Sequence, residues 1–67
     1  MFVQIGDQRI KISSIGRYRD AGFSQAKNQY RVEIKISNTW ENFYFPTEKS
    51  KNILLENLDR ALKVTPL

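Results

Sequence analysis

The 67-residue sequence contains no cysteine and no histidine. Without cysteine the chain forms no disulfide and no thiolate zinc site. Without histidine it has no Ser-His-Asp triad, no Cys-His pair and no imidazole ligand for a metal. We therefore expect no metal site and none of the common nucleophilic catalytic sites. The lack of cysteine also fits a cytoplasmic location, which we expect.

Other features of enzymes and membrane proteins are missing as well. No apolar run approaches the roughly 20 residues of a membrane span, and the first six residues lack the basic and apolar regions of a signal peptide. The glycines Gly6, Gly16 and Gly22 stand apart, so no glycine-rich loop cradles a phosphate. The seven carboxylates form no recognisable catalytic pair or metal-ligand spacing. We expect a non-enzymatic protein with no cofactor and no membrane partner.

Size and charge set the remaining limits. A chain of 67 residues makes one domain, residues 1–67, and a domain of this size buries only about 60% of its unfolded surface. Association with a second copy is therefore an expected source of further stability. The net charge of +4 favours an anionic partner, which could be nucleic acid, an acidic protein or an anionic lipid surface.

Residues 29–46 show the clearest pattern. Four apolar residues alternate with four polar ones, which places the two sets on opposite faces of a β-strand. The apolar set is Tyr30, Val32, Ile34 and Ile36, and the polar set is Arg31, Glu33, Lys35 and Ser37. A short polar turn follows, and Phe43–Phe45 is expected to be the return strand.

The first 28 residues predict a hairpin, a bend and a loop. Residues 2–5 form a short strand, Gly6-Asp7 suits a type II′ turn, and the next strand begins at residue 8 or 9. Alternatively, residues 2–8 lead into one long strand. The alternation breaks at residues 13–16, where we expect a bulge or bend, and resumes at 17–19. Residues 20–28 follow neither period and predict a loop.

The C-terminal part predicts a helix. Thr47 is the expected N-cap, and Glu48 suits the positive end of the helix. The helix should run to about Val64, and Pro66 should stop it. The predicted fold class is α+β, a small antiparallel sheet of three or four strands followed by one C-terminal helix.

The predicted helix has more apolar surface than one sheet requires. Its apolar residues spread over roughly 200° of the circumference, whereas a stripe of about 100° covers a sheet; Lys51 and Asn57 interrupt the arc. One face can therefore cover the sheet while another meets a second subunit. The alternative is a helix sunk deep in its own core. The predicted homodimer interface consists of Ile53, Leu54, Leu55, Leu58 and Leu62.

The basic residues predict a binding surface. Tyr44 falls opposite Phe43 and Phe45, so it joins the polar face of the sheet. Basic groups that contact phosphates, beside aromatic rings that stack on bases, are what single-stranded DNA or RNA requires. The alternative is a solvated face that binds nothing. The predicted basic face carries Arg9, Lys11, Arg17, Arg19, Arg31 and Lys35.

Three stretches resemble a known family. They are residues 2–9 with Ser13 after them, the strand from Arg31 to Trp40, and the strand that enters residues 46–48 and the leucine-bearing helix. This layout resembles the small single-stranded DNA-binding domains of the transcriptional positive cofactor four type, which are related in fold to the Whirly proteins. The resemblance implies a curved sheet, a homodimer formed through the helices, and a grip on unwound DNA by basic and aromatic side chains.

The resemblance adds residues to the candidate site. Trp40 matches the tryptophan at the family's strand end, and Phe23 and Lys27 fall in the loop where the family has an aromatic residue near lysines. That loop is longer here, and the hairpin after the tryptophan is shorter. Strict alternation from Ile36 instead places Trp40 on the apolar face, as a core residue. The alternative function is a small bacterial or phage interaction module that binds an acidic protein.

Overall fold

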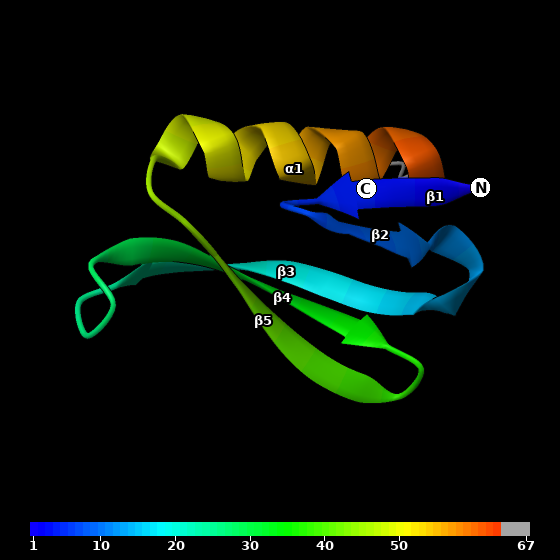
Figure 1. Cartoon of the computed structure of the whole chain (residues 1–67), viewed down its shortest axis with the longest axis horizontal. Helices are drawn as coiled ribbons and strands as arrows, with labels where there is room; N and C mark the ends of the chain where they lie inside the picture. Colours follow the sequence, from blue (N-terminus) through cyan, green and yellow to red (C-terminus); the bar gives the residue numbers. More distant parts are fainter. Residues whose placement is uncertain (64–67) are drawn as a thin grey trace.

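The computed structural model describes residues 1–63, which form five strands and one helix (Figure 1). The α+β fold class with a C-terminal helix is confirmed, and the strands divide into two antiparallel sheets, β1-β2 and β3-β4-β5. The expected helix end at Val64 and the stop at Pro66 lie outside the described residues. The elements are β1 (Phe2–Ile5), β2 (Gln8–Lys11), a 3₁₀ turn (Ile12–Ser14), β3 (Ile15–Ser24), β4 (Gln29–Ile36), β5 (Thr39–Phe45) and α1 (Glu48–Leu62).

The first hairpin forms as predicted. Ile5 and Gln8 are register partners, so Gly6-Asp7 is a two-residue turn. Gly6 has a φ of 62°, which suits the first central position of a type II′ turn and which glycine adopts without strain. Val3, Ile5 and Ile10 are buried in the core, so one side of this hairpin packs inward and the other faces solvent.

The predicted break at residues 13–16 is a 3₁₀ turn followed by a register shift between Ile15 and Arg17. The loop prediction for residues 20–28 is wrong in its first half, because β3 continues to Ser24. A second register shift between Asp20 and Gly22 hides the strand period. There the Gly22 amide donates to Asp20 Oδ1 over 2.9 Å, and Gly22 has a φ of 79°. The turn itself occupies only residues 25–28.

The β4–β5 hairpin is tighter than the sequence suggested. Ser37 and Asn38 have φ values of 50° and 68°, and Ile36 pairs with Thr39. Two positive φ values in a two-residue turn define type I′, whose twist matches that of paired strands. The return strand therefore begins at Thr39, well before the predicted Phe43. This register places Trp40 opposite Lys35.

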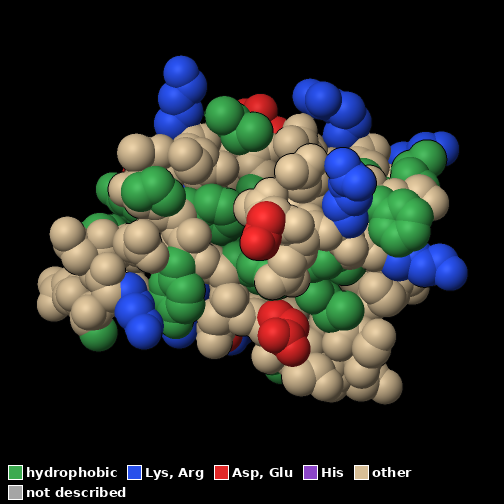
Figure 2. All heavy atoms as spheres, viewed as in Figure 1, with side chains coloured by type: hydrophobic (Ala, Val, Ile, Leu, Met, Phe, Trp, Pro, Cys, Tyr) green, Lys and Arg blue, Asp and Glu red, His purple; other side chains and the backbone are tan. Residues whose placement is uncertain are grey.

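The helix and the first hairpin lie on the same side of the three-stranded sheet (Figure 1). Thr47 is the N-cap, and its Oγ1 accepts from the Ser50 amide over 3.1 Å, as predicted. Val32, Ile34 and Leu58 are fully buried where helix and sheet meet. In the space-filling view, lysine and arginine side chains project mainly from the perimeter (Figure 2). The buried core consists of Val3, Ile5, Ile10, Ile15, Val32, Ile34, Leu54 and Leu58.

One charged side chain is part of the interior of the described residues. Lys51 is only 6% exposed, and its Nζ donates to Asp20 Oδ2 over 2.7 Å. The same Nζ lies 5.7 Å from the centre of the Tyr30 ring. The hydrogen bond from Lys51, and then that from the Gly22 amide, lower the pKa of Asp20. Lys51 therefore ties the helix to the β3 bulge rather than merely interrupting the apolar arc.

Candidate nucleic-acid interface

The side of the three-stranded sheet that faces away from α1 carries the candidate site, and we call it the outer face. Residues that face each other across neighbouring strands share a side of the sheet. Val32 and Ile34 point into the core, so their neighbours along β4 must point outward. By these pairings the outer face consists of Arg17, Arg19, Arg31, Glu33, Lys35, Trp40, Asn42 and Tyr44.

The register arranges the outer face in rows that cross the sheet. One row places Arg17 beside Lys35 and Lys35 beside Trp40. A second row contains Arg19, Glu33 and Asn42, and a third places Arg31 beside Tyr44. Each row therefore combines a cation with an aromatic ring or an amide, the groups that contact phosphates and bases.

The two aromatic rings of the outer face are exposed. Trp40 is 42% exposed and Tyr44 37%. The Arg19 guanidinium lies 5.3 Å from the centre of the Trp40 ring, and Lys27 Nζ lies 5.7 Å from that of Tyr44. Lys27 thus reaches the outer face from the 25–28 turn. The placement of Trp40 as a core residue, which strict alternation predicted, is wrong because the two-residue turn restarts the alternation at Thr39.

Glu33 is the one carboxylate among these outer-face residues. Its Oε1 accepts from Arg19 Nε over 2.6 Å, and this hydrogen bond is the main cause that lowers the pKa of Glu33. Arg19 is therefore held in place between a carboxylate and an indole ring. Within residues 1–63, the ion pairs are Arg19–Glu33 and Lys51–Asp20, so Arg17, Arg31 and Lys35 have no carboxylate partner there.

Two predicted site residues lie elsewhere. Arg9 and Lys11 are exposed on β2, which pairs with β1 in the separate two-stranded sheet. The prediction that one sheet surface carries all six basic residues is corrected, because the break at the 3₁₀ turn separates the two sheets. Four of the six lie on the outer face. Phe23, which the sequence placed in a loop, lies in β3. It is 49% exposed, and its ring meets that of Tyr30 edge-on at 5.1 Å between centres.

The predicted dimer residues fall into a buried group and a more exposed group. Leu54 and Leu58 are 4% and 0% exposed, so they pack in the chain's own core and have almost no surface to offer a second subunit. Leu55 and Leu62 pack partly against that core. Ile53 is 49% exposed on the helix surface. Two of the five predicted interface residues therefore belong to the chain's own core, and the dimer itself stays a prediction.

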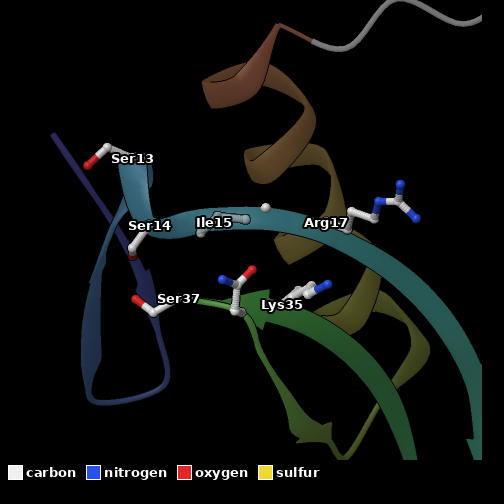
Figure 3. A pocket seen from close by; sticks show the side chains of 8 residues that line it. Ser13, Ser14, Ile15, Arg17, Lys35 and Ser37 are labelled. Atoms are coloured by element: carbon white, nitrogen blue, oxygen red, sulfur yellow. The ribbon is translucent and has the colours of Figure 1, made fainter.

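An open depression of about 410 Å³ lies at one end of the outer face (Figure 3). Sequence reasoning missed it, because its wall comes from two stretches far apart in the sequence, 13–17 and 35–38, and the only signal was the break at residues 13–16. The Ser37 amide donates to the Ser14 carbonyl over 2.9 Å and joins the two stretches. The depression is lined by Ser13, Ser14, Ile15, Gly16, Arg17, Lys35, Ser37 and Asn38.

Two further features bear on function. Across residues 1–63, no three carboxylate, histidine or cysteine side chains gather as a metal site would require. Within the same range, no helix has the length and hydropathy needed to cross a bilayer. Comparison of the chain with protein-family models, curated proteins and solved structures finds no match.

Proposed function

We propose that the outer face binds single-stranded nucleic acid without catalysis. The observation that carries this proposal is the placement of two exposed aromatic rings among basic side chains on one uncovered sheet face. Cations attract the phosphate backbone whatever its sequence. Exposed rings stack on bases, each stack contributing about 1–3 kcal/mol. The family resemblance supports the same function.

The aromatic rings favour a single strand over a duplex. Bases in a duplex are stacked on one another, so a ring on a protein surface reaches their faces only where the strands are separated. Trp40 and Tyr44 are such surface rings. In the free protein Arg19 and Lys27 lie over them. A base then stacks on the opposite side of the ring or displaces the cation, which remains close enough to contact a phosphate.

A direct assay compares labelled single-stranded DNA, single-stranded RNA and duplex DNA of equal length by fluorescence anisotropy. We expect binding of single strands with little sequence preference and weaker binding of the duplex. The logarithm of the affinity should fall linearly with the logarithm of the salt concentration. Failure to bind any single strand at low salt would contradict the proposal and favour an acidic protein partner.

Lys35→Gln tests the phosphate contacts within the same assay. It should weaken binding of every sequence and reduce the salt slope by about 0.7, the value for one phosphate contact on a single strand. The matched control is Lys49→Gln, which removes an exposed charge from the first turn of α1. If both changes weaken binding equally, only the net charge matters and the outer face is not the site.

The homodimer remains a separate proposal. The exposed Ile53 and the partly buried Leu55 and Leu62 are the helix residues that could meet a second copy. Sedimentation at micromolar concentration should then give twice the chain mass. Ile53→Lys should reduce the measured mass to that of a single chain. A single chain mass at every accessible concentration would contradict the dimer without affecting the nucleic-acid proposal. A cytoplasmic location is also a separate proposal, and it is based on the lack of cysteine.

A further inference from the structure

The depression at one end of the outer face brings two positively charged side chains together. Arg17 and Lys35 are direct cross-strand partners, and like charges that face each other across a sheet repel. Figure 3 shows their side chains extending in the same direction from neighbouring strands. Neither forms an ion pair within residues 1–63. A bound anion would offset the repulsion and occupy the space between the two charges.

Neutral hydrogen-bond donors also line the depression. Ser13 and Ser37 line the same depression and come from the 3₁₀ turn and the β4–β5 turn. Within the described residues neither hydroxyl makes a side-chain hydrogen bond, whereas Ser14 Oγ donates to the Lys11 carbonyl over 2.6 Å. Asn38 adds an amide to the lining. Two cations with several neutral donors suit an anion that has several acceptor oxygens.

The wall of the depression is fixed before any ligand binds. Ile15 is buried in the core and anchors the start of β3. The 2.9 Å backbone bond from Ser37 to Ser14 joins the two turns. A site that is ordered in advance spends less free energy on ordering when it binds. The two turns that carry the neutral donors are therefore held together, and the long cationic side chains adjust to the ligand.

We propose that this depression binds a phosphate monoester at the end of the single strand that the outer face holds. The inference rests on the proposed function. A terminal monoester carries close to two negative charges at pH 7 and three free oxygens, whereas each internal diester carries one charge. Lys35 belongs both to the outer face and to the depression, so a strand that lies along the sheet leads directly to it.

The test measures binding of three oligothymidylates of equal length, which carry a 5′-phosphate, a 3′-phosphate or hydroxyls at both ends. One phosphorylated form should bind about tenfold more tightly than the hydroxyl form. Arg17→Gln and Asn38→Gly should bring that ratio close to one. Asn38→Gly keeps the positive φ of the turn, and Arg17→Gln removes a repulsive pair, so both variants should melt no lower than the parent protein.

Arg31→Gln is the matched control, because Arg31 lies on the outer face but not in the depression. It should weaken all three oligonucleotides equally and leave the ratio unchanged. Binding of the hydroxyl form tests the proposed function, and the ratio tests the inference. A ratio of one for both phosphorylated ends would overturn the inference alone. So would binding of inorganic phosphate at Ser13–Arg17, followed by NMR, without any preference for a strand end; that result would assign the depression to a small phosphorylated molecule.

Discussion

The two faces of the three-stranded sheet are built from alternate residues of the same strands, yet they differ in almost every physical property. The inner face is mainly apolar and is covered by α1 and the first hairpin, and Val32 and Ile34 on it are fully buried. Within residues 1–63 no helix or hairpin covers the outer face, and it combines cations with two exposed rings. Stability therefore depends mainly on the inner face, and the outer face is free to bind.

The difference also separates two uses of large side chains. On the inner face, Phe43 and Phe45 pack partly against the buried core, where removal from water stabilises the fold. Trp40 and Tyr44 occupy the alternate positions of β5 and remain exposed. More than a third of each side chain remains in water beside a cation, and in the proposed function this exposed surface meets a base. Substitutions on the two faces should separate these roles.

Ile34→Ala should produce the largest change. Ile34 is 0% exposed in the middle of β4, and truncation of such a side chain costs about 2–5 kcal/mol of unfolding free energy. Arg31→Ala on the outer face of the same strand is the control, and should stay within about 0.5 kcal/mol. Urea unfolding followed by circular dichroism measures both. Equal effects of the two substitutions would contradict the claim that stability depends mainly on the inner face.

Trp40→Ala and Tyr44→Ala should leave the fold largely intact and weaken binding. If each ring stacks on a base, each change should cost about 1–3 kcal/mol of binding free energy, with little effect on the salt slope. Anisotropy titration of a single-stranded oligonucleotide at several salt concentrations measures both quantities. A loss of stability comparable with that of Ile34→Ala would show instead that these rings belong to the core.

Two substitutions test how much the partly buried ion pair between Lys51 of α1 and Asp20 of β3 contributes to stability. Asp20→Asn removes the ionic partner of an ammonium whose side chain is 8% exposed, and should cost about 1–3 kcal/mol. Lys51→Met leaves Asp20, whose side chain is 42% exposed, in contact with water, and should cost less. Chemical denaturation compares the two variants. The reverse order would mean that Lys51 is hydrated and not truly part of the interior.

Tyr18→Phe should give a smaller effect that depends on pH. The Tyr18 hydroxyl donates to Asp59 Oδ1 over 2.7 Å, and its loss should cost about 0.5–1.5 kcal/mol. Burial, followed by this bond and the nearby Asp59 charge, raises the pKa of Tyr18 from 10.0 to about 12. Because the folded pKa is higher, the contribution is complete below pH 10 and is lost as the pH approaches 12.

Thermal melting of the parent and Tyr18→Phe proteins between pH 8 and 12 tests this prediction. The stability difference between the two proteins should shrink across the upper part of that range. A difference that stays constant with pH would show that the hydrogen bond does not persist in solution.

Regular alternation and local turn chemistry made much of the fold predictable. The period of two in residues 30–36 identified the faces of β4 correctly, because burial on one side requires it. Gly6 and Thr47 identified the first turn and the helix start. The prediction failed where the register shifts, since the bulge at Asp20 and Gly22 has the composition of a loop.

The candidate site was harder to predict than the fold. Its basic residues were named from the sequence, but their grouping depends on which strands pair. The 3₁₀ turn at Ile12–Ser14 starts a second sheet and thereby separates Arg9 and Lys11 from the others. The face on which Trp40 lies depends on the two-residue turn at Ser37 and Asn38. Pairing between distant strands leaves no local signal in the sequence, and the turn at Ser37 and Asn38 lacks the glycine that usually marks a type I′ turn.

The fluorescence of Trp40 gives the most direct test of the central claim, because it is the only tryptophan and lies on the outer face beside Lys35. The protein is titrated with a single-stranded oligothymidylate at low salt, and the titration is repeated as the salt concentration rises. We predict saturable quenching whose midpoint shifts steeply with salt. Unchanged fluorescence, together with no binding of any single strand at low salt, would contradict the claim that the outer face binds nucleic acid.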